Sequence, residues 1–225
     1  MLLEDLARWD ERGYAYLQKG ELMVAPVDFD SQRLREGLAN LAPWHRVAFA
    51  VSCVEVLIPA YLKFSELEEA GDRVLVRMWV DAVWSGLQGG NMSSAISELP
   101  SPDSIKELLP VQEEWNEWAP QAEDAIASLV YLLELLRDDN VDLAVYVAER
   151  AYAAADEFEA REQDLEVIGS DDSEVLLQAS SIQAELQRQV DVLSALQDPV
   201  ADSSIIAGLR AAAMRVPVGG LTGAG

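Results

Sequence analysis

The fold is decided by one long apolar stretch, Trp44-His-Arg-Val-Ala-Phe-Ala-Val-Ser-Cys-Val-Glu-Val-Leu-Ile-Pro-Ala-Tyr-Leu-Lys-Phe64. Glu55 is its only charge between Arg46 and Lys63. Both faces of the helix that it predicts are therefore apolar, which is typical of a helix at the centre of a fold. Pro59 has no N–H to donate to the carbonyl of residue 55, four positions earlier. A kink in the helix is therefore expected at Glu55.

A buried carboxylate beside a kink must find hydrogen-bond donors or become protonated. We favour a structural Glu55 that accepts hydrogen bonds from neighbouring N–H, Trp or Tyr groups. The alternative is a functional acid with a raised pKa, in a pocket that includes Pro59 and Tyr61.

Helical periodicity continues along the rest of the chain. In the last long helix, one buried stripe is expected from Val175, Ala179, Ile182, Leu186, Val190 and Leu193. Helices are expected near 2–12, 31–41, 44–64, 72–87, 102–109, 120–138, 141–167, 172–197 and 202–214. The fold class is therefore all-α, a multi-helix bundle of about seven to nine helices.

The helices are expected to form a single all-helical domain over 1–215, followed by a Gly-rich, disordered tail at 216–225. The segment 14–30 is interpreted as a loop. Within it, Glu21-Leu-Met-Val24 has the composition of a short strand but no evident partner strand.

The central stretch resembles the signature helix of the YjaG-like family, a bacterial family of unknown function. The matching positions are Trp44, Phe49, Ser52, Cys53, Glu55, Pro59, Tyr61 and Phe64. The resemblance covers about 35–160, with C-terminal helices at 170–215 packed on that part. The family's Arg after the Glu is Val56 here, so a functional Glu–Arg pair would be broken.

The resemblance implies an all-helical fold and supplies no activity and no catalytic residues. Some YjaG-like relatives lie near toxin genes as candidate immunity proteins. The resemblance thereby implies a binding role.

The charge balance of the chain indicates which classes of partner it can bind. The chain has 40 acids against 16 Lys and Arg, a net charge of −24. Residues 98–185 alone hold 23 acids and 4 bases. Such a field repels nucleic-acid phosphates and anionic membrane surfaces. It suits a basic protein partner, and the simpler interpretation is a set of solvated helix faces.

The compartment is inferred from three features. The single cysteine, Cys53, cannot form an intrachain disulfide, which favours a reducing compartment. The first residues carry acids where a signal peptide has Lys or Arg. No apolar run reaches transmembrane length, and the longest, Val47 to Leu62, contains Glu55 and Pro59. We therefore expect a cytoplasmic protein.

No catalytic residue, cofactor or metal site is predicted, and an enzyme is the less favoured class. The only histidine, His45, lies eight residues from Cys53. On one helix that is roughly 12 Å, far beyond the reach of a Cys–His pair. No Glu-x-x-His motif, P-loop or dinucleotide fingerprint occurs.

The favoured hypothesis is an acidic binding protein, of the immunity type, that masks a basic partner such as a toxin. The expected docking residues, with both tryptophans exposed, are Glu113, Glu114, Trp115, Glu117, Trp118, Asp138 and Asp139. One alternative is a small-molecule binder or enzyme that uses an acidic pocket near Glu55. Another is a structural protein that forms a homodimer or larger assembly through its C-terminal helices.

Overall fold

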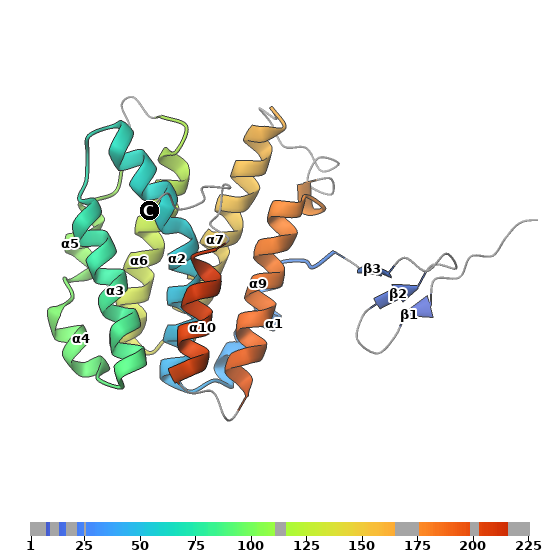
Figure 1. Ribbon diagram of the computed structural model, residues 1–225, viewed down its shortest axis with the longest axis horizontal. Helices are drawn as coiled ribbons and strands as arrows, with labels where there is room; N and C mark the ends of the chain where they lie inside the picture. The colour runs from blue at the N-terminus through green and yellow to red at the C-terminus, as the bar shows by residue number, and fades with distance from the viewer. Residues whose placement is uncertain are drawn as a thin grey trace, which may run out of the picture.

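The computed structural model describes residues 26–110, 116–164, 176–198 and 203–215, together with the backbone of three short strands at 8–9, 14–16 and 22–24. Nine helices lie in these ranges and pack side by side as a bundle (Figure 1). The bounds are α1 Ser31–Ala39, α2 Pro43–Leu67, α3 Arg73–Gly89, α4 Met92–Glu98, α5 Pro102–Lys106, α6 Ala119–Asp138, α7 Val141–Glu162, α9 Ser180–Gln197 and α10 Ser203–Ala213. The expected all-α fold class is confirmed.

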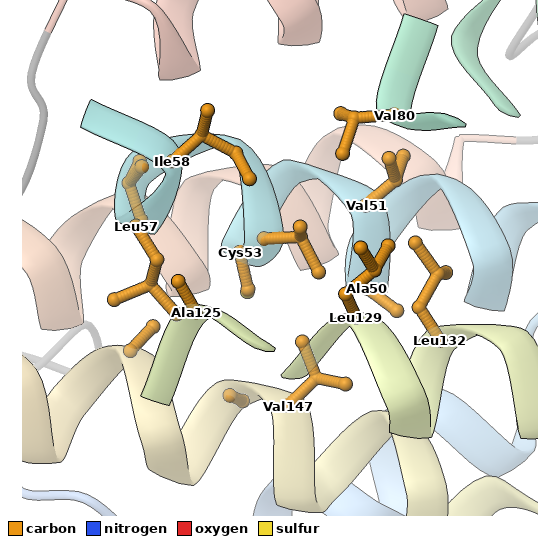
Figure 2. Close-up of a cluster of buried hydrophobic side chains, with 14 of the residues drawn as sticks. Ala50, Val51, Cys53, Leu57, Ile58, Val80, Ala125, Leu129, Leu132 and Val147 are labelled. Atoms are coloured by element: carbon orange, nitrogen blue, oxygen red, sulfur yellow. The ribbon is translucent and has the colours of Figure 1, made fainter. Parts of the chain in front are cut away.

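Helix α2 runs through the centre of the bundle, as its sequence predicts. Every residue from Val47 to Ile58 is buried, and the helix continues through Pro59 without interruption. It packs against α3, α6, α7, α9 and α10. Figure 2 shows apolar side chains of α2 meeting those of α3, α6 and α7. Because both faces of α2 are apolar, partners on all sides are needed to cover it.

Helix α2 is also long and apolar enough to cross a membrane, with a mean hydropathy of 1.7 over its best 18-residue window. However, 83% of that window is buried inside the bundle. This environment is that of a core helix, so its composition is explained by packing.

Helices α6 and α7 form an antiparallel hairpin with a very short turn. Asp139 ends α6 in the left-handed region, with φ 48°. Asn140 then caps α7, since its side chain accepts a hydrogen bond from the N–H of Asp142 at 3.0 Å. The buried face of α7 carries six alanines, Ala144, Ala148, Ala151, Ala154, Ala155 and Ala160. Their small side chains let the two helices approach closely, and the outer faces of this hairpin carry the candidate site described below.

The N-terminal region differs from the prediction. β1 Arg8–Trp9, β2 Tyr14–Tyr16 and β3 Leu22–Val24 form an antiparallel sheet in the order β1-β2-β3. The expected helix is therefore wrong at 8–9, and the expected loop is wrong at 14–16 and 22–24. The partner strand that the sequence did not reveal is β2, because three residues are too few to show a period of two.

The predicted stripe of α9 is also partly wrong. Val190 is 47% exposed, whereas Glu185, Arg188 and Gln189 are buried. The buried face is Ile182, Glu185, Leu186, Arg188, Gln189, Val192 and Leu196. Because three buried positions of α9 are polar, a prediction from apolar residues alone places the buried face on the wrong side of the helix. Val190 is the only large apolar side chain of α9 that is exposed.

The tail at 216–225 lies outside the described residues. Other boundaries shift by a few positions, since α5 ends at Lys106, α7 ends at Glu162 and α9 begins at Ser180. The short helix α4 was not expected from the sequence. It is capped by the side chain of Asn91, which accepts a hydrogen bond from the N–H of Ser94.

Candidate functional site

The four expected docking residues that the structure describes lie at opposite ends of α6. Glu113, Glu114 and Trp115 lie outside the described residues. Glu117 and Trp118 precede α6, whereas Asp138 and Asp139 lie at its far end. A helix of 20 residues separates the two ends by about 30 Å. A docking surface that includes both ends must therefore extend along the whole of α6.

The expectation that Trp118 is exposed is wrong, since it is only 9% exposed. The guanidinium of Arg161 lies 4.8 Å from the centre of its ring. Arg161 also donates a hydrogen bond to the backbone carbonyl of Glu117, whose residue is exposed. Trp118 therefore helps to fix the start of α6 under Arg161. The residues next to Trp118 in the sequence are polar and suggested that it is exposed. They could not predict that Arg161, from α7, covers its ring.

Asp139 is engaged in the structure as well. Both of its carboxylate oxygens accept hydrogen bonds from Arg46, and the Nη2–Oδ2 distance is 2.7 Å. This ion pair fastens the α6–α7 turn to the start of α2. Asp139 is therefore paired within the chain although its side chain is 47% exposed, and the neighbouring Asp138 is exposed as well.

Between these two ends, the outer faces of α6 and α7 form a groove of about 270 Å³. Its lining residues are Tyr131, Tyr146, Glu149, Arg150 and Ala153. The two tyrosine rings are 5.5 Å apart and tilted by 51°. Tyr146 is 41% exposed. Two aromatic rings and a charged rim make this groove a candidate binding site.

Helical spacing explains why acids surround the groove. Positions three, four and seven apart share one face of a helix. The outer face of α6 therefore carries Glu123, Tyr131, Glu134 and Asp138, and that of α7 carries Tyr146, Glu149, Ala153, Asp156 and Glu157. We call the six acids of this set the acidic face: Glu123, Glu134, Asp138, Glu149, Asp156 and Glu157.

An ion pair with a buried carboxylate lies at the groove. Arg150 donates a hydrogen bond to Oδ1 of Asp124 at 2.9 Å, and Asp124 is 2% exposed. Among the described residues, Oδ2 of Asp124, Oε1 of Gln121 and Oγ of Ser128 have no hydrogen-bond partner. They follow one another along α6, one turn apart, and all are buried acceptors or hydroxyls. Ordered water is the ordinary partner of such groups.

This environment raises the pKa values of two carboxyl groups, those of Asp124 and Glu157. Burial raises the pKa of Asp124 to about 6, although Arg150 opposes the shift. Burial and the nearby Asp124 carboxylate raise the pKa of Glu157 to about 7, even though Glu157 remains an exposed residue. The charge on this part of the acidic face therefore changes near neutral pH.

Asp124→Asn is expected to stabilise the protein above pH 6. The folded-state pKa of Asp124 lies above the ordinary value of 3.8, so the folded state binds the proton more tightly. The free energy of unfolding must then fall as pH rises from about 4 to 6. Asparagine mimics the protonated acid and should be more stable by roughly 1–3 kcal/mol at pH 7.5. Urea unfolding between pH 4 and 8 measures both curves.

Glu157→Gln is the companion variant in that experiment. Glu157 should also make the free energy of unfolding fall as pH rises, from its ordinary pKa to about 7. A double variant should remove both declines. Equal pH slopes for wild type and Asp124→Asn would show that Asp124 does not titrate in this range.

Glu55 lies in a second polar cluster, at the interface of α2 and α3. It is 3% exposed. Its Oε2 accepts hydrogen bonds from Nη2 of Arg77 at 2.9 Å and from Nε1 of Trp84 at 2.8 Å, while Oε1 pairs with Nη1 of Arg77. Arg77 also pairs with Asp81, which Arg210 of α10 contacts. The donors bind both oxygens, which favours a structural role over a reactive acid.

The environments of Val56 and Tyr61, near Glu55, could not be predicted from the sequence. Val56 is fully buried where the family has arginine, and the cation for Glu55 comes instead from Arg77. The hydroxyl of Tyr61 accepts a hydrogen bond from the N–H of Asp72 at 3.1 Å. Gly71 has φ 75°, and a Cβ there would collide with that hydroxyl. Tyr61 thus fixes the α2–α3 turn.

A third polar cluster, missed by sequence reasoning, surrounds Arg188 in the core. Its guanidinium donates to both carboxylate oxygens of Glu185, at 2.6 and 2.7 Å, and to Oγ of Ser52 at 3.1 Å. Nη2 also lies 3.3 Å from Sγ of Cys53. Burial raises the pKa of the Cys53 thiol. The cysteine is therefore an inert core residue, because the thiolate is the nucleophile.

The remaining chemistry-bearing residues form no reactive set. His45 is half-buried near the start of α2, two turns from Cys53. Among the described residues, no group of three or more His, Cys, Asp or Glu side chains is arranged to hold a metal ion.

The fold and the site define a class: an all-α bundle with an acidic, tyrosine-lined outer helical hairpin. The chain belongs to the DUF416 family, described as a protein of unknown function, whose model matches residues 33–219. The expected YjaG-like membership is confirmed. The match includes the C-terminal helices α9 and α10.

A solved structure supports the fold. The chain is similar to the crystal structure of a DUF416 family protein from Shewanella baltica, with a TM-score of 0.67 and 16% sequence identity. The alignment covers 80% of this chain and 93% of that one. At this identity the likeness concerns the fold alone. A comparison with curated proteins found no match.

Proposed function

We propose that the protein is a binding protein that takes a basic protein partner on the acidic face of α6 and α7. Residues 119–164 contain twelve acids and three arginines. None of the six acids of the acidic face forms an ion pair with another described residue. Such a cluster of unpaired like charges attracts a basic surface over a distance.

The single observation that carries the proposal is that all three arginines of this hairpin are already engaged. Arg137 donates to the backbone carbonyls of Leu133 and Pro100. Arg150 binds Asp124, and Arg161 binds the start of α6. These hydrogen bonds leave the arginine charges in place, but among the described residues none of the three arginines forms an ion pair with an acid of the acidic face. Masking of a basic partner, as an immunity protein masks a toxin, uses such a surface.

The apolar anchor of the interface is proposed to be Tyr131 and Tyr146 instead of Trp115 and Trp118. Aromatic side chains near the centre of a charged surface are the usual binding hot spots. Tyr146 is 41% exposed, and both rings lie between the acids of α6 and those of α7.

Charge reversal of the acidic face is expected to abolish capture of the partner. The triple variant Glu123→Lys, Glu149→Lys, Glu157→Lys changes the net charge by +6 where the partner is proposed to dock. Capture from cells of the native host with wild-type protein, followed by mass spectrometry, should enrich a basic protein that the variant loses. Its association rate with wild type should fall at least about tenfold between low and high salt.

The matched control is Glu36→Lys, Glu98→Lys, Glu107→Lys, which makes the same change in net charge at exposed acids elsewhere. This control should retain the partner and slow its association much less. If both triple variants capture the same proteins as wild type, the acidic face is a plain solvated surface and the proposal is wrong.

A further inference from the structure

We infer that the groove lined by Tyr131, Tyr146, Glu149, Arg150 and Ala153 receives an arginine side chain of the partner. This inference rests on the proposed function and names the group that the acidic face recognises. It follows from the size of the groove, the charges at its rim and the geometry of its two rings.

The size of the groove fits one long side chain. Its volume is about 270 Å³, whereas pockets for drug-sized ligands and cofactors span about 300–1,000 Å³. Part of its wall is the methyl group of Ala153, the smallest side chain among the lining residues. A larger residue there would fill the space.

The charge at the rim favours a cation. Glu149 lines the groove, and Glu157 lies one helical turn beyond Ala153 on the same face of α7. Arg150 is the only lining cation. Its charge is opposed by Asp124, which accepts its hydrogen bond at 2.9 Å. Glu149 is left to set the sign of the field that an entering side chain meets, and Glu157 adds to that field as it ionises near pH 7.

The rings favour arginine over lysine. A guanidinium is planar, is weakly hydrated and stacks on an aromatic face, and it binds a carboxylate through two parallel hydrogen bonds. The Tyr146 ring is partly exposed and tilted against that of Tyr131. An arginine can therefore lie on the ring of Tyr146 with its head at Glu149, while its stem covers Ala153.

The test uses the full chain labelled with ¹³C in its alanine methyl groups, and three acetylated, amidated peptides as probes. These peptides are Gly-Gly-Xaa-Gly-Gly with arginine, lysine or norleucine in the centre. Titration followed by NMR should give a saturable shift of the Ala153 methyl signal with the arginine peptide. The lysine peptide should bind several-fold more weakly, and norleucine should leave the signal unchanged.

Two sets of variants locate the probe. Ala153→Leu fills the groove without changing any charge and should remove saturable binding, read from the tyrosine ring signals. Tyr146→Ala should weaken binding of the arginine peptide about two- to fivefold, while Tyr146→Phe keeps the ring and should bind like wild type. Equal affinity for arginine and lysine, or binding that survives Ala153→Leu, would overturn the inference.

The inference and the proposed function fail in different ways. If Ala153→Leu captures the partner as well as wild type does, while the charge-reversed variant loses it, the acidic face binds without an inserted arginine. If charge reversal leaves capture unchanged, the proposed function fails whatever the peptides do.

Discussion

Replacing Glu55 by leucine is expected to lower the free energy of unfolding by about 2–4 kcal/mol. The change removes the acceptor for the indole N–H of Trp84 and for two N–H groups of Arg77. Trp84 is fully buried and cannot turn to water, whereas the Arg77 side chain is 27% exposed and keeps Asp81. Urea unfolding at pH 7 measures the loss.

Two further variants make the Glu55 result specific. Glu55→Gln keeps an acceptor for Trp84 and should cost about 1 kcal/mol. Asp81→Asn weakens another partner of the same Arg77, and should cost less than about 1 kcal/mol because Asp81 is 42% exposed. A Glu55→Leu protein as stable as wild type would show that stability does not need this acid, and would restore Glu55 as a functional candidate.

The central helix could be predicted from the sequence because a single fact determines its environment. An apolar surface on both sides of a helix must be covered, so Trp44 to Phe64 had to lie among other helices. Glu55 could likewise be placed in the core. Its partner could not, because Arg77 lies 22 residues away on another helix and only the packing of α2 on α3 brings them together.

The candidate site was harder to predict for the same reason. Local acidity drew attention to Trp118 and Asp139, but arginines from distant elements, Arg161 and Arg46, occupy them. Tyr131 and Tyr146 were not singled out, since each lies in an ordinary amphipathic helix. Their proximity, 5.5 Å between ring centres, exists only once α6 and α7 pair as a hairpin. The signal that could have found them is their shared outer face with the acids.

Arg188→Met is expected to be the most damaging single change, at about 3–5 kcal/mol. Glu185 is 3% exposed and accepts two hydrogen bonds from Arg188. Without the guanidinium, a carboxylate stays in the core with only Gln189 as a donor, at 2.8 Å. The loss in unfolding free energy should therefore exceed the value that an exposed ion pair would give. Chemical unfolding at pH 7, with matched circular dichroism spectra, measures it.

The double variant Arg188→Met, Glu185→Leu should recover most of that stability, because the neighbours of the pair keep other partners. Ser52 still donates to the carbonyl of Phe49 at 2.7 Å, and Gln189 still donates to that of Ala148 at 3.1 Å. Two apolar side chains then fill the space of two charges that were costly to desolvate. If the double variant is as unstable as Arg188→Met alone, the pair contributes more than mutual neutralisation, and its contacts with Ser52 and Cys53 must be what hold α9 against α2.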